Sequence, residues 1–381
     1  MRRSYLDHAS TTPARPEAEA AFSSWFRLAA ADPGRLHEEG RTVRDALEVA
    51  RNQVAALIGA TAREVVFTSG ATEAINTAVF GACRRQPGAP VLLAGVEHSA
   101  VRDASARWAP VELLRVDRDG LLDVGALADR LHSKESTPAL VHCQWANHEV
   151  GTLQPVHEVV RHCREAGVLV HVDAAAACGH VAMDLAALGA DLVSLSAHKL
   201  GGTPGAGALI VRRGSRFDPL LVGGEQERAR RGGLEALPAL LAFGAAAGAL
   251  GESGQARLIA EADTARHQIT QATQAALAVE DVQVVGPSSP EARLPHLVCL
   301  GVLGVEAEPV LIGLDRAGIA VHSGSACSSE SIEPSPVLEA MGVDASHSLR
   351  LSVGWTTSDA DVEAFAGAFP EVVGGLRSLR G

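Results

Sequence analysis

The chain has 381 residues, of which 47% are apolar and 20% charged, so it is long and apolar enough to build a large packed core. That length accommodates two domains, or one large α/β domain with an appendage. The net charge of −12 and the lack of a basic stripe in the sequence argue against direct binding of DNA or RNA, because contacts to phosphate dominate such binding.

Strand and helix patterns alternate through the first two thirds of the chain. Residues 41–58 carry apolar side chains at helical spacing, and Gly59 ends this predicted helix. Short apolar runs predict strands at 64–69, 91–95, 139–146, 168–174, 191–196 and 207–213, and the helical patterns include 72–83, 155–166 and 235–250. The alternation predicts an α/β domain with a mainly parallel sheet.

The pattern changes after about residue 251. The elements predicted there are a long polar helix at 254–278, strands near 282–285 and 296–303, a helix at 307–317 and a strand at 348–353. Together they predict a second, smaller α+β domain. We therefore expect a large domain at 17–250 and a small domain formed by 1–16 and 251–381.

The cysteines and the N-terminus bear on the cellular compartment. Six cysteines are scattered without a CxxC pair or a zinc-like spacing, which favours a reducing cytoplasm and free thiols. The N-terminal segment has no apolar h-region, so it does not predict a secretory signal. The longest uncharged run, 236–251, is too short and too interrupted to span a bilayer. We expect a cytoplasmic protein without a membrane span.

Ligands of open α/β sheets bind beyond the carboxyl ends of the strands, so the residues that follow each predicted strand are candidate site residues. After the first strand, Gly70 allows a tight turn, and Ala71, Thr72 and Glu73 begin a helix. Backbone N–H groups at a helix N-terminus bind anions, which predicts a phosphate site. The alternative interpretation is an ordinary strand–helix turn.

Three further strand ends carry polar residues whose roles stay open on the sequence alone. His98 follows the second strand, and a lone histidine is more often a surface or core residue than a catalytic one. Asn147 follows the third strand, where a loop asparagine usually bonds its own turn. Asp173 ends the fourth strand, and it either caps the next helix or contacts a ligand.

The strand at 191–196 is followed by Ala197, His198 and Lys199 and then by a glycine-rich segment. A lysine in this place can form a Schiff base if its surroundings favour the neutral amine. The glycines do not form a GxGxxG fingerprint, so a dinucleotide site is not predicted. A phosphate cradle, a Schiff-base lysine and an acid that can pair with a pyridinium nitrogen are together what pyridoxal 5'-phosphate (PLP) requires.

Seven segments resemble, in order and over nearly the whole chain, the motifs of the NifS/IscS-type cysteine desulfurases. They are "YLDHASTTP", "VFTSGATEAIN", "EHSAV", "HVDAA", "SLSAHKLGGTPGAGALIVRRG", "GGEQERARRGG" and "VHSGSACSSESIEPSPVLEAMG". These enzymes use PLP and have the class V aminotransferase fold, a PLP-dependent transferase fold similar to that of aspartate aminotransferase. The long "SGSACSS" form of the last segment resembles the group with an extended cysteine loop.

The resemblance implies PLP as the cofactor. The residues that would contact it are Lys199, Asp173, His98, Ala71, Thr72, Asn147, Ser196 and His198. Lys199 would bind PLP covalently, and Asp173 would pair with its pyridine nitrogen. His98 would stack on the ring and serve proton transfers. Asn147 would lie near the ring hydroxyl, and the remaining four residues would hold the phosphate.

The same resemblance assigns the substrate and the sulfur carrier. Arg350, with Asn147 nearby, would bind the carboxylate of L-cysteine through its planar fork. Cys327 would take the sulfur as a persulfide and pass it to a protein acceptor. Free cysteine is usually buried, whereas Cys327 stands in the small polar run 321–330, which suits a carrier that must visit both the pocket and an acceptor. A homodimer is expected.

Several positions depart from the family pattern. Ala176 stands where the family usually has Gln, and Leu234 stands where it usually has a Thr that reaches the neighbouring subunit's phosphate. The early "NP" motif reads "DP" at 32–33. The departures predict fewer cofactor contacts unless Arg230 or Arg231 reaches the phosphate across the dimer interface.

Two other functions stay open. A selenocysteine lyase or another class V PLP lyase would share the site, and the dependence of cysteine turnover on Cys327 distinguishes it. An inactive scaffold for sulfur-transfer partners would lack PLP absorbance, and the intact set of candidate residues argues against it. The downstream pathway is iron–sulfur assembly, tRNA thiolation or DNA phosphorothioation. The departures and the Ala/Arg/Gly-rich composition favour a donor similar to the DNA-phosphorothioation desulfurase.

Overall fold

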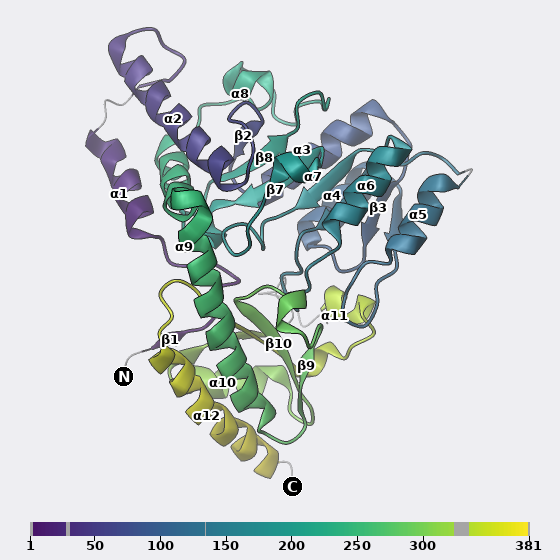
Figure 1. The fold of residues 1–381 in the computed structure, drawn as a ribbon, viewed down its shortest axis with the longest axis vertical. Helices are drawn as coiled ribbons and strands as arrows, with labels where there is room; N and C mark the ends of the chain where they lie inside the picture. Colours follow the sequence, from purple (N-terminus) through teal and green to yellow (C-terminus); the bar gives the residue numbers. More distant parts are fainter. Residues whose placement is uncertain (1–2, 28–30, 134, 324–334, 380–381) are drawn as a thin grey trace.

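The computed structural model describes residues 3–27, 31–133, 135–323 and 335–379, except for the side chains at 252–254. Cys327, the predicted sulfur carrier, lies outside the described residues. Figure 1 shows a larger upper part built on a sheet, a smaller lower part, and a long helix that runs beside both. Within the described residues, no helix is long and apolar enough to cross a membrane.

A seven-stranded sheet forms the centre of the larger part (Figure 1). In spatial order its strands are β2 (Val65–Thr68), β8 (Gly207–Val211), β7 (Leu192–Ser196), β6 (Val170–Asp173), β5 (Leu140–Gln144), β3 (Val91–Ala94) and β4 (Val111–Leu114). The pairs from β7 to β4 are parallel, whereas β8 runs antiparallel to both of its neighbours. The predicted mainly parallel sheet is therefore confirmed. Because β5, β6 and β7 are buried at every residue, their apolar runs do not alternate with exposed polar positions.

Helices cover both faces of this sheet. On one face, Ile75 of α3 and Val101 of α4 join Leu140 and Leu209 of the sheet in one apolar cluster. On the other face, the neighbouring strand residues belong to the core shared with α2, α6 and α9. The helices of this part are α1 (Pro16–Ser24), α2 (Glu38–Leu57), α3 (Ala71–Arg85), α4 (Ser99–Trp108), α5 (Val124–His132), α6 (Val156–Ala166), α7 (Leu185–Leu188) and α8 (Gln226–Ala229).

The smaller part contains a four-stranded antiparallel sheet in the order β12 (His322–Ser323), β13 (Ser348–Ser352), β10 (Leu297–Val302) and β9 (Val282–Val285). Its helices are α10 (Ala307–Arg316), α11 (Pro336–Ala340) and α12 (Asp359–Ser378). Phe365 and Phe369 of α12 are fully buried against Leu300 and Leu351 of the sheet. The N-terminal strand β1 (Ser4–Tyr5) pairs with β11 (Ile319–Ala320), so the first residues lie with this C-terminal part.

Helix α9 spans Leu237–Leu277, 41 residues, but Gln255 within it has a φ of +68°, outside the right-handed helical region, so the backbone is interrupted near the point where the sequence predicted separate helices at 235–250 and 254–278. The glycines elsewhere in α9 do not interrupt it, because a helix interior tolerates glycine at a cost of about 1 kcal/mol each. Gly244 instead lets α9 approach α2, since a Cβ there would collide with Ala50. The proposed domain boundary at residue 250 falls inside this helix.

Candidate active site

The first turn of α3 forms one wall of a cavity of about 420 Å³ at the carboxyl ends of the strands. Gly70 precedes the helix, and Ala71 and Thr72 begin it, so unbonded N–H groups of the first turn border the cavity. Gly207 of β8 packs against this turn: a Cβ there would lie 2.6 Å from the Gly70 backbone. Helix termini of this kind bind anions, and Ser196 lines the same cavity.

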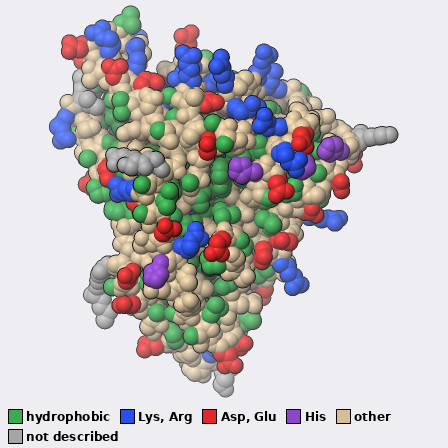
Figure 2. Space-filling model, viewed as in Figure 1, with side chains coloured by type: hydrophobic (Ala, Val, Ile, Leu, Met, Phe, Trp, Pro, Cys, Tyr) green, Lys and Arg blue, Asp and Glu red, His purple; other side chains and the backbone are tan. Residues whose placement is uncertain are grey.

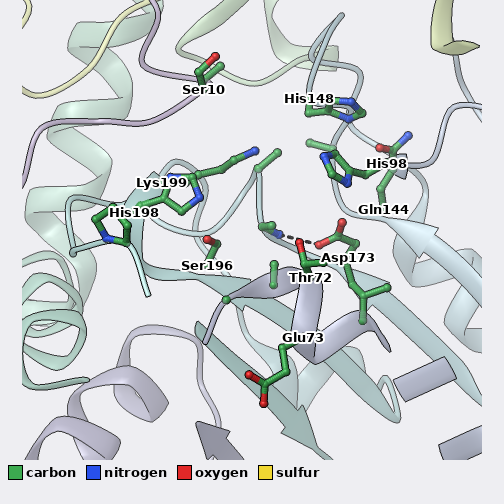
Figure 3. A pocket seen from close by; sticks show the side chains of 18 of the residues that line it. Ser10, Thr72, Glu73, His98, Gln144, His148, Asp173, Ser196, His198 and Lys199 are labelled. Atoms are coloured by element: carbon green, nitrogen blue, oxygen red, sulfur yellow. Dashed lines mark hydrogen bonds between the residues drawn. The ribbon is translucent and has the colours of Figure 1, made fainter. Parts of the chain in front are cut away.

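Asp173 ends β6 and turns its carboxylate into the cavity (Figure 3). Its Oδ1 accepts hydrogen bonds from the Ser194 hydroxyl at 2.8 Å and from the Ala175 amide at 3.1 Å. These bonds fix the carboxylate, which is only 8% exposed. The side chain therefore faces the cavity, and it also bonds the turn that follows it.

Lys199 ends a short 3-10 turn, Ala197–Lys199, directly after β7. Figure 3 shows its side chain reaching into the cavity, between the wall that carries His198 and the wall that carries His98. His198 Nδ1 lies 3.2 Å from the Thr11 hydroxyl, which ties this turn to the N-terminal segment. The amine of Lys199 is thus placed opposite the carboxylate of Asp173 in one cavity.

His98 and His148 form an edge-to-face ring pair with centroids 4.9 Å apart, and both line the cavity (Figure 3). His98 Nδ1 accepts a hydrogen bond from the Ala100 amide at 3.1 Å, so Nε2 is its other, exchangeable nitrogen. Burial, with His148 and Lys199 nearby, lowers the pKa of His98 to about 3. Burial also lowers the pKa of His148 to about 3, so both imidazoles are neutral at physiological pH.

Arg350 of β13 brings the smaller part of the molecule to the cavity. Its guanidinium donates to the His148 carbonyl at 3.0 Å, to Asp7 Oδ1 at 2.9 Å and to the Ser10 hydroxyl at 2.6 Å. Its Nε is buried and has no partner among the described residues. The side chain is therefore held by the 7–10 segment and by the loop that carries His148.

Asn147 is buried but does not belong to the cavity lining. Its amide donates to the Val96 carbonyl at 3.1 Å, and its Oδ1 accepts from the amides of Glu149 and Val150 at 2.8 Å each. This is the turn-forming role that a loop asparagine commonly has. The cavity residues that neighbour it in sequence are instead Gln144, Ala146 and His148.

The two residues that depart from the family pattern, Ala176 and Leu234, lie in different surroundings. Ala176 lines the cavity, and its methyl group has no hydrogen-bonding capacity. Leu234 is 60% exposed. Arg231 pairs through Nε with Glu73 Oε1 at 2.9 Å, and Arg230 donates to the Arg63 carbonyl at 3.3 Å. Both arginines are therefore bonded within their own chain.

A second, small cavity behind Lys199 was not foreseen from the sequence. Its lining includes four imidazoles, those of His8, His148, His180 and His296, which come from well-separated segments. His180 donates through Nε2 to the Lys199 carbonyl at 3.1 Å, and its ring stacks on His296 with centroids 3.5 Å apart. Polar groups so far apart in sequence give no local pattern that would have predicted their contact.

Acid is expected to destabilise the folded protein through its buried histidines. Burial is the largest cause that lowers their pKa values, to about 4 or about 3: the six are His8, His98, His148, His171, His180 and His198. The unfolded chain therefore binds more protons as the pH falls below about 6.5. Each histidine removes up to about 1.4 kcal/mol of stability per pH unit there. Urea unfolding is expected to show a lower midpoint at pH 5 than at pH 7.

Two buried acids act in the opposite direction. Burial raises the pKa of Glu97 to about 8 and that of Glu149 to about 7, so the stability they contribute at low pH is lost as the pH rises through these values. The histidines outnumber them, so stability is expected to be greatest near neutral pH. A midpoint at pH 5 equal to or above that at pH 7 would contradict this balance.

Comparison with known proteins places this geometry in a family. The aminotransferase class-V family matches residues 4–365. A cysteine desulfurase of Cereibacter sphaeroides is 39% identical over 391 aligned positions, which cover 100% of this chain and 98% of that protein. A solved NifS-like protein has a TM-score of 0.89 at 27% identity, covering 98% of this chain and 100% of its own. A structure of SspA in complex with cysteine has a TM-score of 0.79 at 25% identity, covering 93% and 100%. The chain therefore belongs to the class-V aminotransferase family and, within it, to the cysteine desulfurases.

Proposed function

We propose that this protein is a PLP-dependent cysteine desulfurase that converts L-cysteine to L-alanine and leaves the sulfur as a persulfide on Cys327. The observation that carries the proposal is the meeting of Lys199, Asp173 and the first turn of α3 in one cavity. Relatives at up to 39% identity over the full chain are named cysteine desulfurases, which supports the same reaction. The structure of SspA with cysteine supports cysteine as the ligand class.

The residues present fit PLP. A cavity of about 420 Å³ has a helix N-terminus for a phosphate, a fixed carboxylate for a pyridine nitrogen, and a lysine for a covalent bond. Ala71, Thr72, Ser196 and His198 would hold the phosphate. When bound, PLP supplies a conjugated ring that takes up the electron pair released at the substrate α-carbon.

The side chains of the cavity would each have a different role in the reaction. Asp173, fixed by Ser194, would hold a proton at the ring nitrogen. Lys199 would attach the cofactor and, when the substrate amine replaces it, its Nζ would move the proton of the α-carbon. His98 would exchange a proton at the substrate thiol through Nε2, the nitrogen that its backbone bond leaves available. Arg350 would bind the substrate carboxylate.

The sulfur step needs a nucleophile that Cys327 would supply. Its thiolate would attack the substrate sulfur, and the bond between that sulfur and Cβ would break with its electron pair staying on carbon. A proton at Cβ then completes L-alanine, and Cys327 keeps the sulfur as a persulfide. Assay of alanine and sulfide from L-cysteine, with Cys327 present and with it replaced, tests this. A selenocysteine lyase would process L-cysteine independently of Cys327. A purified protein without PLP absorbance would instead favour the inactive scaffold.

The protein partners are proposed at the level of chemistry. A protein acceptor would take the persulfide sulfur. A homodimer would bring Leu234 and its neighbours to the catalytic cavity of the other subunit. The acceptor would belong to iron–sulfur assembly, tRNA thiolation or DNA phosphorothioation. We propose DNA phosphorothioation because of the departures at Ala176 and Leu234. We also propose a cytoplasmic location. A pull-down with the persulfidated protein would identify the acceptor.

The departures predict looser cofactor binding. Ala176 cannot donate to the ring hydroxyl, and Leu234 cannot donate to a phosphate of the neighbouring subunit. Each missing charge-assisted hydrogen bond is expected to weaken binding by about 1.5–3 kcal/mol. The double change Ala176→Gln with Leu234→Thr is therefore expected to slow the loss of PLP during dialysis, measured by absorbance. Equal rates in the parent and the double variant would show that other contacts hold the cofactor.

A further inference from the structure

An arginine-rich hollow lies at the opposite edge of the large sheet from the catalytic cavity. It has a volume of about 620 Å³ and is open to solvent. Its charged lining consists of Arg85, Arg164, Arg212, Arg213, Arg216 and Asp191. We call this the arginine hollow. It borders the amino ends of β6 and β7 and the carboxyl end of the antiparallel β8, whereas Lys199 and Asp173 follow carboxyl ends.

The charge of the arginine hollow is not balanced by acids. Asp191 is buried and already accepts from Arg212, from the Ser215 hydroxyl at 3.1 Å and from the Val170 amide at 3.1 Å. At the rim, Asp218 lies 3.8 Å from Arg85. Glu64 accepts a hydrogen bond from the Arg213 amide at 3.2 Å, so five guanidinium groups gather around Asp191 with Asp218 and Glu64 at the edge, in a protein whose net charge is −12. Like charges gathered at one place repel, so the gathering needs a physical reason.

Helix ends account for only part of this gathering. Arg85 ends α3 and Arg164 lies in the last turn of α6, where a positive side chain complements the helix dipole. Arg212, Arg213 and Arg216 instead belong to the loop after β8. Helix dipoles therefore do not explain the three arginines of the loop.

Several guanidinium groups remain available to a ligand. Among the described residues, the side chains of Arg164, Arg213 and Arg216 form no ion pair, and the buried Nε of Arg212 has no hydrogen-bond partner. Arg213 and Arg216 are exposed, so their forks can turn toward a ligand without unfolding the loop. Figure 2 shows Lys and Arg side chains gathering on the large upper part of the face in view, with Asp and Glu prominent on the lower part.

The lining selects a class of ligand. Planar guanidinium forks bind phosphate oxygens in pairs, and several forks around one hollow favour a ligand with more than one charged oxygen cluster. The lining contains no aromatic residue or histidine, so it offers no platform for stacking a nucleobase. A volume of about 620 Å³ exceeds what a single phosphate fills and admits a diphosphate.

We propose that the arginine hollow is a second ligand site, distinct from the catalytic cavity, which binds a small polyphosphate anion of the diphosphate class. The site does not depend on the desulfurase reaction, because none of its arginines borders the catalytic cavity. Phosphate chemistry reaches a protein either as a free anion or as part of a nucleic-acid backbone. A concave hollow without stacking residues favours the free anion.

The test is isothermal titration of inorganic pyrophosphate into the PLP-loaded protein, in phosphate-free buffer at constant ionic strength. We expect one saturable site per chain and a higher unfolding temperature with pyrophosphate. The double variant Arg213→Ala with Arg216→Ala is expected to bind about a hundredfold more weakly, since each charge-assisted contact is worth about tenfold or more. Its cysteine turnover is expected to equal that of the parent.

Arg115→Ala with Arg118→Ala is the matched control, because both residues are exposed, lie outside the hollow and change the net charge equally. This control is expected to keep parental affinity. Absence of saturable binding to the parent, or equal weakening in both double variants, would overturn the proposal. A short single-stranded DNA that displaces pyrophosphate at lower concentration, through Arg213 and Arg216, would overturn the assignment to a free anion.

Discussion

Replacement of Cys327 by Ser is expected to abolish sulfide release from L-cysteine under reducing conditions and to leave PLP bound. A serine hydroxyl is a far weaker nucleophile than a thiolate, and loss of a catalytic nucleophile commonly costs on the order of 10³-fold or more in rate. Cofactor binding depends on Lys199, Asp173 and the α3 turn, so the PLP absorbance is expected to stay unchanged. Sulfide production and the visible spectrum of the same preparation measure the two effects.

The other five cysteines are poor alternatives to Cys327 as the residue that takes up the sulfur. Cys83, Cys143, Cys163, Cys178 and Cys299 are all buried. Burial raises the pKa of Cys163, Cys178 and Cys299 to about 12, so these thiols stay protonated and weakly nucleophilic. Mass spectrometry is expected to find the transferred sulfur on the Cys327 peptide, and Cys83→Ala serves as a control that keeps activity. A persulfide found mainly on Cys143 or Cys178 would refute the assignment.

Six strands of the large sheet were predictable because they are buried at every residue, whereas β4, which is partly exposed, was not predicted. β5, β6 and β7 read as short continuous runs of apolar residues, which is the pattern of a central parallel strand. The two helical patterns at 235–250 and 254–278 correspond to the parts of α9 on either side of the interruption at Gln255. Its glycines make it a weak helix on its own, and packing against α2 stabilises it.

The carboxyl-end rule found part of the site because the ends of neighbouring parallel strands meet at one edge. It indicated Asp173, Lys199 and the α3 turn from the sequence alone, and all three line one cavity. The rule applies to the strands of one sheet and not to residues of another part of the chain. Arg350 was therefore predicted only from the resemblance to a family. His148 was not among the predicted site residues, and the imidazoles behind Lys199 meet only in three dimensions.

Lys199→Ala is expected to remove both the absorbance of lysine-bound PLP and the turnover of L-cysteine, by on the order of 10³-fold or more, because no other amine among the described residues lines the cavity. The chain makes this test unusually sharp, since its sequence contains two lysines, Lys134 and Lys199. Borohydride reduction of the PLP-loaded protein followed by peptide mapping is expected to place the label on Lys199. Lys134→Ala is the matched control and is expected to keep the spectrum and the activity. Label on Lys134, or an unchanged spectrum in Lys199→Ala, would remove the basis for assigning this cavity to PLP. The arrangement of Asp173 opposite the lysine argues for the expected outcome, because a fixed and mostly buried carboxylate is stabilised by a protonated ring nitrogen beside it.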